Sequence, residues 1–389
     1  MYPSMKVLHI VKTAVGARWA YEQVRILRSL GIGVVVALPS DTGGLAPRYR
    51  EAGATVVRAK LDLPARQPWR LPGALRTCRE LVEQVLPDLI HTHHVGTTFV
   101  VRLALGKHSP IPRVFQVAGP LHLESAAFAK LDIQSAGPLD HWISTCRWTY
   151  SKYLELGVPS GRVSLSYAGI DVRPFQNVRA GKLRQELGIA GNTPLIGMVA
   201  YMYAPKWFLG QERGLKGHED FMAALSLARE RHPEIHGVII GGPWGDAQWY
   251  EDRLRYLGSK LCDGFLTFLG TRHDIPVLYP DIDLAVMASH SENVGGAVEP
   301  LLSGIPVVAT NVGGLPDLVQ DGRTGWLVPP RDPAALSRAI LEALENKDEA
   351  RRRTVEGQRL ARQMFDVERT GREVAAIYER ILARSSQTH

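Results

Sequence analysis

The sequence predicts an α/β fold made of two parallel-sheet domains with Rossmann-like topology. Short apolar runs typical of strands alternate with amphipathic helical segments along most of the 389 residues. The alternation stops near Asp171–Phe175 and then begins again, and the length suits two domains of ordinary size. Two successive series of this kind indicate two separate parallel sheets.

The first series predicts an N-terminal domain over residues 1–172. Segments with helical period separate its strands, for example at Trp19–Leu30, Leu75–Val85 and Thr97–Leu105. The expected strands are Lys6–Val11, Val34–Leu38, Ala54–Val57, Leu89–His91, Arg113–Val117, Trp142–Ser144 and Val163–Ser166.

The second series predicts another domain over residues 173–365. The linker between the domains should lie within Tyr167–Val178, which contains Gly and Pro and has little periodicity. Beyond the last strand, Lys347–Leu382 has the composition of one continuous helix. The expected strands are Leu195–Val199, Gly237–Ile240, Phe265–Leu269, Leu284–Val286, Val307–Ala309 and Trp326–Val328.

Composition excludes several classes of protein. No apolar run approaches the roughly 18–20 residues that span a bilayer, and the opening MYPSMKVLHIV lacks a cleavable signal pattern. Three widely spaced cysteines without a CxxC pair favour a reducing cytoplasm. No nucleic-acid motif or aromatic-interleaved basic run occurs. We therefore expect a cytoplasmic protein that does not bind nucleic acid.

The net charge of +7 is unevenly distributed along the chain. Residues 1–175 hold 21 Lys and Arg against 12 Asp and Glu, a balance of +9, and the remainder holds 25 against 27, a balance of −2. A basic first half suits an acidic acceptor or peripheral contact with an anionic membrane. The alternative is that these arginines are ordinary solvated surface.

The most informative segment is Ser289–Val328. Glu292 and Glu299 flank the pair Gly295–Gly296, where a loop should turn into a helix. A helix start offers backbone N–H groups and the positive end of the helix dipole to a phosphate. Each carboxylate can accept hydrogen bonds from vicinal hydroxyls of a sugar or ribose. The segment therefore predicts a nucleotide-sugar site that uses the backbone of Gly295, Gly296, Ala297 and Val298.

The same segment could instead be a plain buried βαβ unit, with a helix at 295–303 and a strand at Pro306–Ala309. That interpretation leaves the second glycine pair, Gly313–Gly314, unexplained, because it opens another helix directly after the next strand. Two successive strand–glycine–helix junctions would place two anion-binding helix starts on one sheet edge. We favour the ligand site.

The segment strongly resembles the retaining glycosyltransferases of family 4, the group 1 glycosyl transferases of GT-B fold. The resemblance rests on the acid-to-acid segment, on EPLLSGIPVVATNVGG and on DGRTGWLVPPRDPAALSRAI. It runs through most of the chain, and closely after about residue 190. The family usually places seven residues between its two acids, whereas Glu292 and Glu299 have six between them.

The resemblance implies a two-domain GT-B enzyme whose strand ends face one cleft. The C-terminal domain should hold a nucleotide-diphosphate-sugar, with UDP-sugar favoured and GDP-sugar possible. A helix at 366–389 should cross back onto the N-terminal domain, and no metal or other cofactor should be required. The acceptor hydroxyl could belong to a polysaccharide, a lipid-linked glycan or a secondary metabolite.

Residue roles follow from the same resemblance. Lys216 matches the lysine of a Lys-Gly pair that neutralises the diphosphate, and Arg213 would replace an arginine that the family places elsewhere. Glu292 should bind the transferred sugar, Glu299 the ribose, and His122 should reach the donor sugar. The loop of Gly16 and the segment with Arg272 should also contact the donor.

On the acceptor side we expect Arg18 and His93. The run LIHTHH at Leu89–His94 could suggest a metal site, but no acid or cysteine completes a ligand set nearby, so we predict cleft-lining histidines. The insert at Tyr203–Arg213 contains Trp207 and Phe208 and could form a lid or a self-packed loop.

Two other functions stay open at this point. One is a GT-B-type nucleotide-sugar epimerase, which needs acids placed for proton abstraction and no acceptor. The other is a partner protein that binds a nucleotide-sugar but has lost catalysis. Ala118 and Tyr201, which replace family residues, and the shortened acid spacing make the second conceivable.

Overall fold

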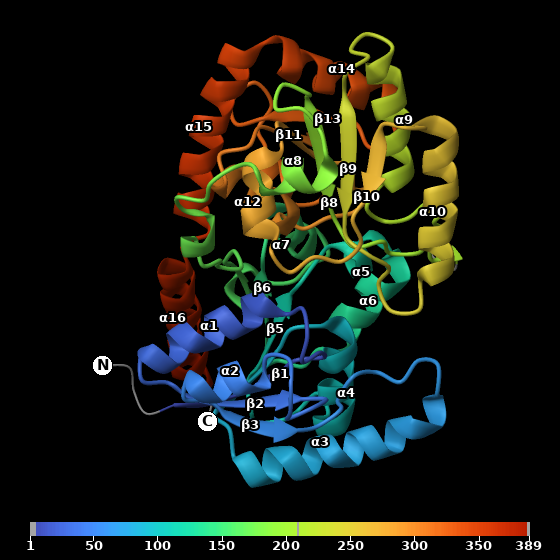
Figure 1. Cartoon of the computed structure of the whole chain (residues 1–389). Coiled ribbons are helices and arrows are strands. Elements are labelled where there is room, and N and C mark those ends of the chain that lie inside the picture. The colour runs from blue at the N-terminus through green and yellow to red at the C-terminus, as the bar shows by residue number, and fades with distance from the viewer. Residues whose placement is uncertain (1–4, 208–209, 387–389) are drawn as a thin grey trace. The chain divides into compact units, whose positions relative to one another are not determined.

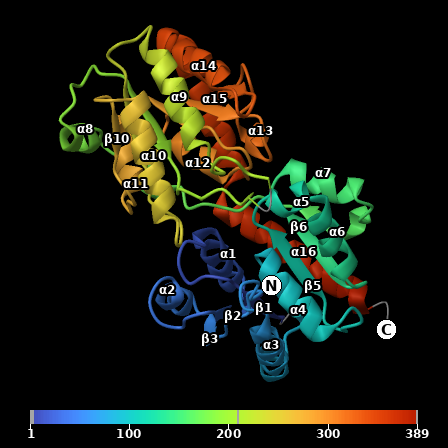
Figure 2. The same cartoon turned by 90° about the vertical axis from the view of Figure 1, so that its right-hand side faces the viewer.

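The chain folds into two compact units, each built on one parallel sheet (Figures 1 and 2). The structure is a computed structural model that describes residues 5–207 and 210–386. Unit 1 comprises Met1–Asp171 and Phe365–His389, and unit 2 comprises Val172–Met364. The predicted fold class of two Rossmann-like parallel sheets is confirmed.

Unit 1 has a sheet of seven strands in the order β3-β2-β1-β4-β5-β6-β7, with all neighbours parallel. The strands are β1 (Lys6–Ile10), β2 (Gly33–Leu38), β3 (Thr55–Arg58), β4 (Leu89–Thr92), β5 (Arg113–Val117), β6 (Asp140–Ser144) and β7 (Val163–Leu165). The helices are α1 (Arg18–Ser29), α2 (Ala46–Glu51), α3 (Leu71–Val85), α4 (Val95–Leu105), α5 (Leu121–Glu124), α6 (Ala126–Ser135), α7 (Arg147–Glu155) and α16 (Val367–Ser386).

Unit 2 has a sheet of six strands in the order β10-β9-β8-β11-β12-β13, again all parallel. The strands are β8 (Leu195–Val199), β9 (His236–Ile240), β10 (Leu266–Phe268), β11 (Leu284–Met287), β12 (Val307–Thr310) and β13 (Trp326–Val328). The helices are α8 (Lys182–Leu187), α9 (His218–Arg229), α10 (Gln248–Leu261), α11 (Ile275–Leu278), α12 (Gly295–Leu302), α13 (Leu315–Leu318), α14 (Pro333–Glu345) and α15 (Lys347–Met364).

The strands of both sheets form because their apolar runs are buried on both faces, as parallel sheets require. In unit 2, Phe221 of α9, Leu254 of α10 and Ile340 of α14 share one core with Val286 of β11. In unit 1, α1 and α16 share a core with β1 and β2, and a second core lies under α3 and α4. Helices thus cover both faces of the unit 1 sheet.

The expected continuous helix at Lys347–Leu382 is wrong, because the chain breaks into α15 and α16 at Phe365–Asp366. Phe365 is buried and its carbonyl accepts the N–H of Ile170 at 2.9 Å. The Asp366 carboxylate accepts the N–H of Arg369 at 2.6 Å, which caps the start of α16. The break lies where the chain passes from unit 2 into unit 1, and α16 packs along α1 (Figure 1).

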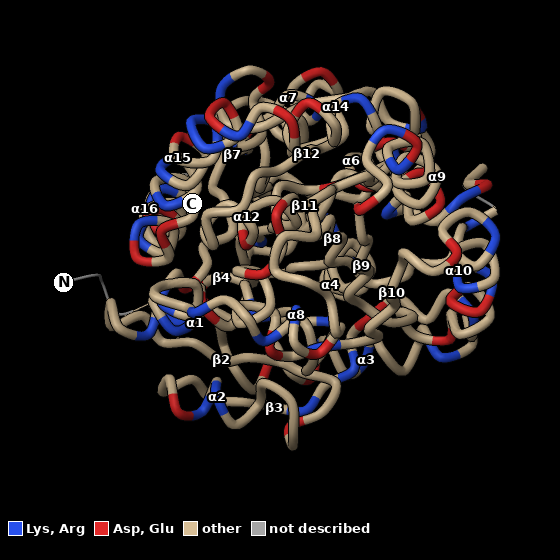
Figure 3. The backbone as a smooth tube through the Cα atoms, turned by 45° about the horizontal axis from the view of Figure 1, so that its top comes forward, with Lys and Arg blue, Asp and Glu red and all other residues tan. Residues whose placement is uncertain are grey.

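Surface charge is mixed on the helices of unit 2, and basic and acidic residues intersperse along α10 and α15 (Figure 3). Among the described residues, no helix is long and apolar enough to cross a membrane.

Gly371 fixes how closely α16 approaches α1. A Cβ on Gly371 would lie 2.4 Å from Cγ2 of Ile26, whereas a Cβ on Gly73 in α3 would meet no atom within 4 Å. Gly-to-Ala changes in open helix positions stabilise by roughly 0.5–1 kcal/mol. We expect Gly73→Ala to raise the free energy of unfolding and Gly371→Ala to lower it, as measured by urea denaturation. Stabilisation by both variants would contradict this packing.

Candidate active site

The strongest candidate site lies in unit 2 where the strand order reverses. β8 and β11 are neighbours, yet the chain leaves them toward opposite edges of the sheet, and such a switch point is where open α/β sheets bind ligands. Lys216 follows β8 and Glu292 follows β11. Their side chains form an ion pair and are only 18% and 12% exposed. Two residues predicted to contact the donor are thus brought into direct contact.

Several further groups hold Glu292 in place. The Ser289 hydroxyl donates to its Oε2 at 3.1 Å, and the N–H of Asn293 donates to its Oε1 at 3.1 Å. The N–H of Gly314 donates to the Glu292 carbonyl at 3.1 Å. The carboxylate is therefore oriented by groups on its own loop and by Lys216. Ser289 was not predicted as a site residue.

Gly217 is the backbone feature that brings Lys216 to this position. Its φ of +71° lies in the left-handed region, and a Cβ there would lie 1.9 Å from the Ala288 carbonyl oxygen. Only glycine tolerates both conditions. The Lys-Gly pair thus lets the start of α9 approach the end of β11, which explains why the lysine and the glycine occur together.

The predicted helix start at Gly295–Gly296 is present as α12. Its N-cap residue Val294 gives no side-chain cap, and the space around a Cβ on Gly295 is open. Ala297 and Val298 have buried side chains, so only their backbone could meet a ligand. A Cβ on Gly296 would lie 3.6 Å from Oε2 of Glu292, which puts this helix start beside the ion pair.

The second expected helix start, after Gly313–Gly314, does not serve as an anion site. α13 is one turn of four residues, and the N–H of Gly314 already donates to Glu292. The glycines therefore join the loop after β12 to the acid rather than leave N–H groups for a ligand. The expectation of two anion-binding helix starts is therefore wrong for the start of α13.

Glu299 lies on α12 and is half-buried. Burial raises the pKa of Tyr279 well above its ordinary value, and the nearby charge of Glu299 raises it further. Arg272 pairs with Asp274 at 2.9 Å and with Glu186 at 2.5 Å, so its guanidinium is already occupied by acids of unit 2.

Arg213 is bound to an acid as well. It forms an ion pair with Asp220 of α9, and the other oxygen of Asp220 meets Nε2 of His290. The N–H of His290 donates to the Leu215 carbonyl at 2.8 Å. Asp220 and His290, which the sequence did not single out, therefore fasten the segment that carries Arg213 and Lys216.

An aromatic group lies next to the lysine. The Lys216 ammonium lies 5.8 Å from the ring centroid of Tyr203, and both Tyr201 and Tyr203 pack against Trp244. Burial, followed by the charge of Glu292, raises the pKa of Tyr203 to about 12, so its hydroxyl stays protonated at neutral pH. Trp207 is 80% exposed, and Phe208 of the proposed lid lies outside the described residues.

The site residues expected in unit 1 lie on separate features. Gly16 has a φ of +89° in the loop after β1, and Arg18 begins α1. Nε2 of His122 lies 3.1 Å from the Tyr153 hydroxyl and 3.4 Å from buried Asp132. Burial alone would raise the pKa of Asp132, but the hydrogen bond to His122 and the charge of Arg102 hold it below its ordinary value. His122 thus helps keep a buried carboxylate ionised.

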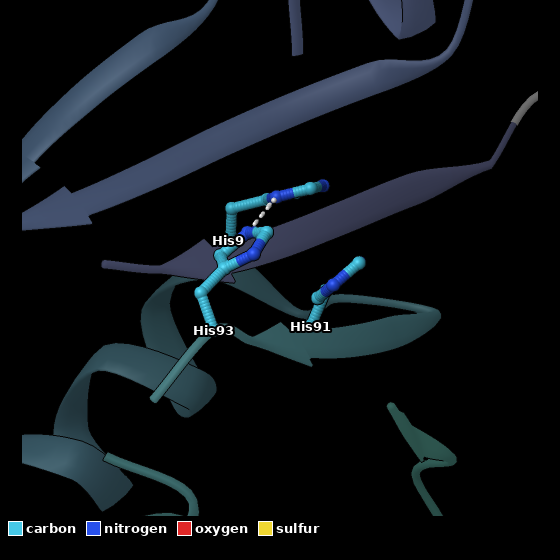
Figure 4. Close-up of side chains that lie close together, drawn as sticks. All are labelled: His9, His91 and His93. Carbon is cyan, nitrogen blue, oxygen red and sulfur yellow. Dashed lines mark hydrogen bonds between the residues drawn. The ribbon is translucent and has the colours of Figure 1, made fainter. Parts of the chain in front are cut away.

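His93 does not line a surface, contrary to the prediction for the strand-end histidines. His9, His91 and His93 are all fully buried and lie close together on the sheet (Figure 4). His9 and His91 are register partners on β1 and β4. His93 lies two residues beyond His91, and its Nε2 is 3.0 Å from Nδ1 of His9. Side chains two residues apart on a strand share a face, and here α1 and α16 cover that face.

Tyr378 of α16 joins this group, and its hydroxyl contacts Nδ1 of His91 and lies 3.2 Å from Nε2 of His9. Burial lowers the pKa of His9 to about 3 and those of His91 and His93 well below their ordinary value, so the rings are neutral. Neutral imidazoles can bind metals, and their ligand atoms lie within 4.8 Å. His91 stacks on both neighbours, at interplanar angles of 26° and 21°.

Comparisons with known proteins identify the family and the fold. A model of group 1 glycosyl transferases matches residues 207–346, and a model of glycosyltransferase family 4 matches residues 16–173. A D-inositol 3-phosphate glycosyltransferase from Acidothermus cellulolyticus is 28% identical over 352 residues, which are 82% of this chain and 76% of that protein. Spore coat protein SA from Bacillus subtilis is 26% identical over 55% of this chain and 58% of its own length.

Solved structures show the same fold. Anabaena HepE in complex with UDP-glucose has a TM-score of 0.79 at 22% identity, covering 96% of this chain and 99% of its own. Sucrose-phosphate synthase from Thermosynechococcus elongatus has a TM-score of 0.78 at 18% identity, covering 98% of this chain and all of its own. Two Rossmann-like units of this topology form a GT-B fold. The chain belongs to glycosyltransferase family 4 and is a hexosyltransferase-type enzyme.

The buried histidines predict a loss of stability in acid. The folded pKa of His9, about 3, lies below its ordinary 6.5, so the unfolded state takes up the proton first as pH falls. The contribution of neutral His9 to the free energy of unfolding is complete above pH 6.5. It declines as the pH falls below that value, by roughly 1 kcal/mol at pH 5.5. His9→Gln should therefore lose less stability than the unchanged protein between pH 7.5 and 5.5 in urea titrations. Ile10→Val, a buried change without a titratable group, should keep the original slope; equal slopes for both variants would contradict the assignment.

Proposed function

We propose that the protein transfers a sugar from a nucleotide-diphosphate-sugar to an acceptor hydroxyl with retention of anomeric configuration. The Lys216–Glu292 pair beside the uncapped start of α12 is the observation that carries this proposal. A cation next to N–H groups that have no side-chain cap suits a diphosphate. Glu292 is the acid that would bind the transferred sugar, and Glu299 the one that would bind the ribose.

Lys216 would act most strongly as the bond to the sugar breaks. Negative charge then develops on the leaving diphosphate, and a positioned ammonium stabilises it more than it stabilises the bound substrate. Glu292 holds the ammonium in place before the donor arrives. Arg213 is a second cation on the same segment, and Asp220 restrains it in the same way.

For the donor we favour a UDP-sugar, with a GDP-sugar as the alternative, because HepE of the same fold was solved with UDP-glucose. The acceptor would be a polysaccharide, a lipid-linked glycan or a small molecule. Relatives named D-inositol 3-phosphate glycosyltransferases add a phosphorylated cyclic polyol to this group. We propose catalysis without a metal cofactor and a cytoplasmic location.

Lys216→Ala should lower turnover by about a hundredfold or more, with a smaller change in the Michaelis constant. The reason is that its charge is needed mainly in the transition state. The measurement is initial-rate kinetics with a UDP-sugar and its acceptor. Lys260→Ala removes an exposed lysine of α10 and should leave turnover as it is. Turnover of Lys216→Ala within a few-fold of the unchanged enzyme would assign the role to another residue.

Glu299→Ala should weaken nucleotide binding by roughly 1.5–3 kcal/mol, the range for a hydrogen bond to a charged group. Isothermal titration calorimetry with UDP measures the affinity directly. With a nucleotide that contains deoxyribose in place of ribose, most of the difference in affinity between Glu299→Ala and the unchanged protein should disappear. Glu230→Ala, a change at an exposed residue on the surface of unit 2, is the control. Unchanged affinity of Glu299→Ala would exclude the ribose contact.

Product analysis with a labelled donor tests the function itself. Label in a glycosylated acceptor with the donor's anomeric configuration supports the proposal, and inverted configuration would overturn the retaining part. Label in an epimerised donor, or none beyond the donor, would overturn transfer altogether. Repeating the assay after exhaustive chelation tests the metal-free mechanism.

A further inference from the structure

Three aromatic side chains, those of Tyr201, Tyr203 and Trp244, lie together in unit 2 next to the candidate site. The ring centroid of Trp244 lies 5.1 Å from that of Tyr201 and 5.5 Å from that of Tyr203. We propose that this aromatic platform binds a neutral pyranose ring of the acceptor, so that the acceptor itself contains a sugar. The inference deepens the proposed function and rests on it, because only transfer requires an acceptor.

The two loops that carry these rings continue the pairing of β8 with β9. Val199 and Ile240 are register partners at the ends of these parallel strands. Three residues further along each chain, Met202 pairs with Pro243 in the same register. The N–H of Trp244 then donates to the Met202 carbonyl at 3.1 Å. The pairing therefore extends past the carboxyl ends of both strands, the edge where open α/β sheets bind ligands.

Alternation along this extended pair places the three rings on one face. Met202 is fully buried and belongs to the core of unit 2. Neighbouring side chains on a strand point to opposite faces, so Tyr201 and Tyr203 lie on the face away from this core. Trp244, the residue after the partner of Met202, shares that face and contacts both tyrosines. The platform is open, since Trp244 is 43% and Tyr201 36% exposed.

The platform adjoins the residues assigned to the donor. The Lys216 ammonium lies 5.8 Å from the ring centroid of Tyr203, and Lys216 pairs with Glu292. Glu292 and α12 follow β11 on one side of β8, whereas Trp244 follows β9 on the other side. The platform therefore lies beside the proposed point of transfer, on the side away from the acids that would bind the donor's sugar and ribose. This position assigns it to the second substrate, the acceptor.

The chemistry of the platform favours a neutral sugar. The faces of aromatic rings carry partial negative charge, which attracts weakly positive C–H groups and disfavours anions. The phenol of Tyr203 is itself uncharged, because burial and then the charge of Glu292 raise its pKa to about 12. A pyranose presents a C–H face that can cover a ring, and its hydroxyls can bond to those of the tyrosines. Tyr and Trp supply this contact area at a low cost in side-chain entropy.

The first experiment measures binding of neutral disaccharides of glucose, galactose, mannose and N-acetylglucosamine by saturation-transfer NMR, with UDP present to fill the donor site. At least one disaccharide should bind, with the strongest transfer to the C–H protons of one ring face. Trp244→Ala and Tyr201→Ala should each weaken its binding by about fivefold or more, since each removes a ring from the platform. Trp244→Phe keeps a ring at this position and should recover most of the affinity.

The matched control is Tyr256→Ala, which removes an exposed tyrosine of α10 outside the platform. It should bind the disaccharide as the unchanged protein does. UDP affinity, measured by calorimetry, should be equal in the unchanged protein and in all four variants.

Three outcomes would overturn the proposal. The first is that none of the disaccharides binds to the unchanged protein, and the second is equal affinity in Trp244→Ala, Tyr201→Ala and Tyr256→Ala. The third is a loss of UDP affinity in Trp244→Ala at an unchanged urea midpoint, which would assign the rings to the nucleobase. Failure of the proposed function is separate, since it would appear as absent binding of both UDP and GDP in the unchanged protein.

A transfer assay tests whether the bound disaccharide is the acceptor. With labelled UDP- and GDP-sugars, label should move to the disaccharide. Trp244→Ala should raise the Michaelis constant for the disaccharide by about the factor by which it weakens binding and leave that for the donor unchanged, because lost ground-state binding appears in this constant. Binding that depends on Trp244 without transfer from any of these donors would overturn the assignment to the acceptor.

Discussion

The ion pair between Lys216 and Glu292 is the interaction on which the candidate site depends. It joins the loops after β8 and β11 across the switch point, and both side chains are largely buried. A buried charge without a partner is costly, so each residue requires the other while no donor is bound. Gly217 makes the pairing geometrically possible, because no larger residue could lie against the Ala288 carbonyl.

The acids in this site also explain why the cations stay in place without a ligand. Lys216 is held by Glu292 and Arg213 by Asp220, and His290 binds the same aspartate. These contacts reduce the side-chain entropy that ligand binding would otherwise have to remove. In unit 1, neutral histidines are bonded to Tyr378 of α16. Unit 1 also buries charges, because Arg102 forms ion pairs with Asp132 and Asp140.

The fold could be predicted well from the sequence because parallel strands buried on both faces give short apolar runs that helical segments separate. The break between α15 and α16 could not, since both helices are amphipathic and rich in charge on either side of it. Asp366, a good N-cap residue followed by a helical pattern, is the signal that could have located it. The position of His93 was missed because alternation gives the face of a strand but not which helix covers that face.

The candidate site was predictable only where chemistry and backbone requirements coincide in one short motif. Lys216 with Gly217, and Glu292 with Gly295–Gly296, are such cases. Asp220 and His290 act through a contact between segments 70 residues apart, which no local pattern encodes. Ser289 lies only three residues from Glu292, but a serine at that spacing is too common to mark a site. A pocket of unit 1 lined by Lys12, Lys60 and Arg70 could not be predicted for the same reason. Its cations come from two strand ends and one turn, and each alone looks like solvated surface.

A diphosphate entering the site would have to compete with the acids for the same cations. Lys216 can turn from Glu292 toward the phosphate only if the carboxylate gains other partners, and sugar hydroxyls are suitable donors. The Ser289 hydroxyl and the N–H of Asn293 already donate hydrogen bonds to the Glu292 carboxylate. The sugar and the diphosphate would therefore be recognised together, since the sugar offsets the loss of the lysine from the acid. Under the proposed function, free nucleotide would lack that compensation, and the arrangement would favour the intact donor over the released diphosphate.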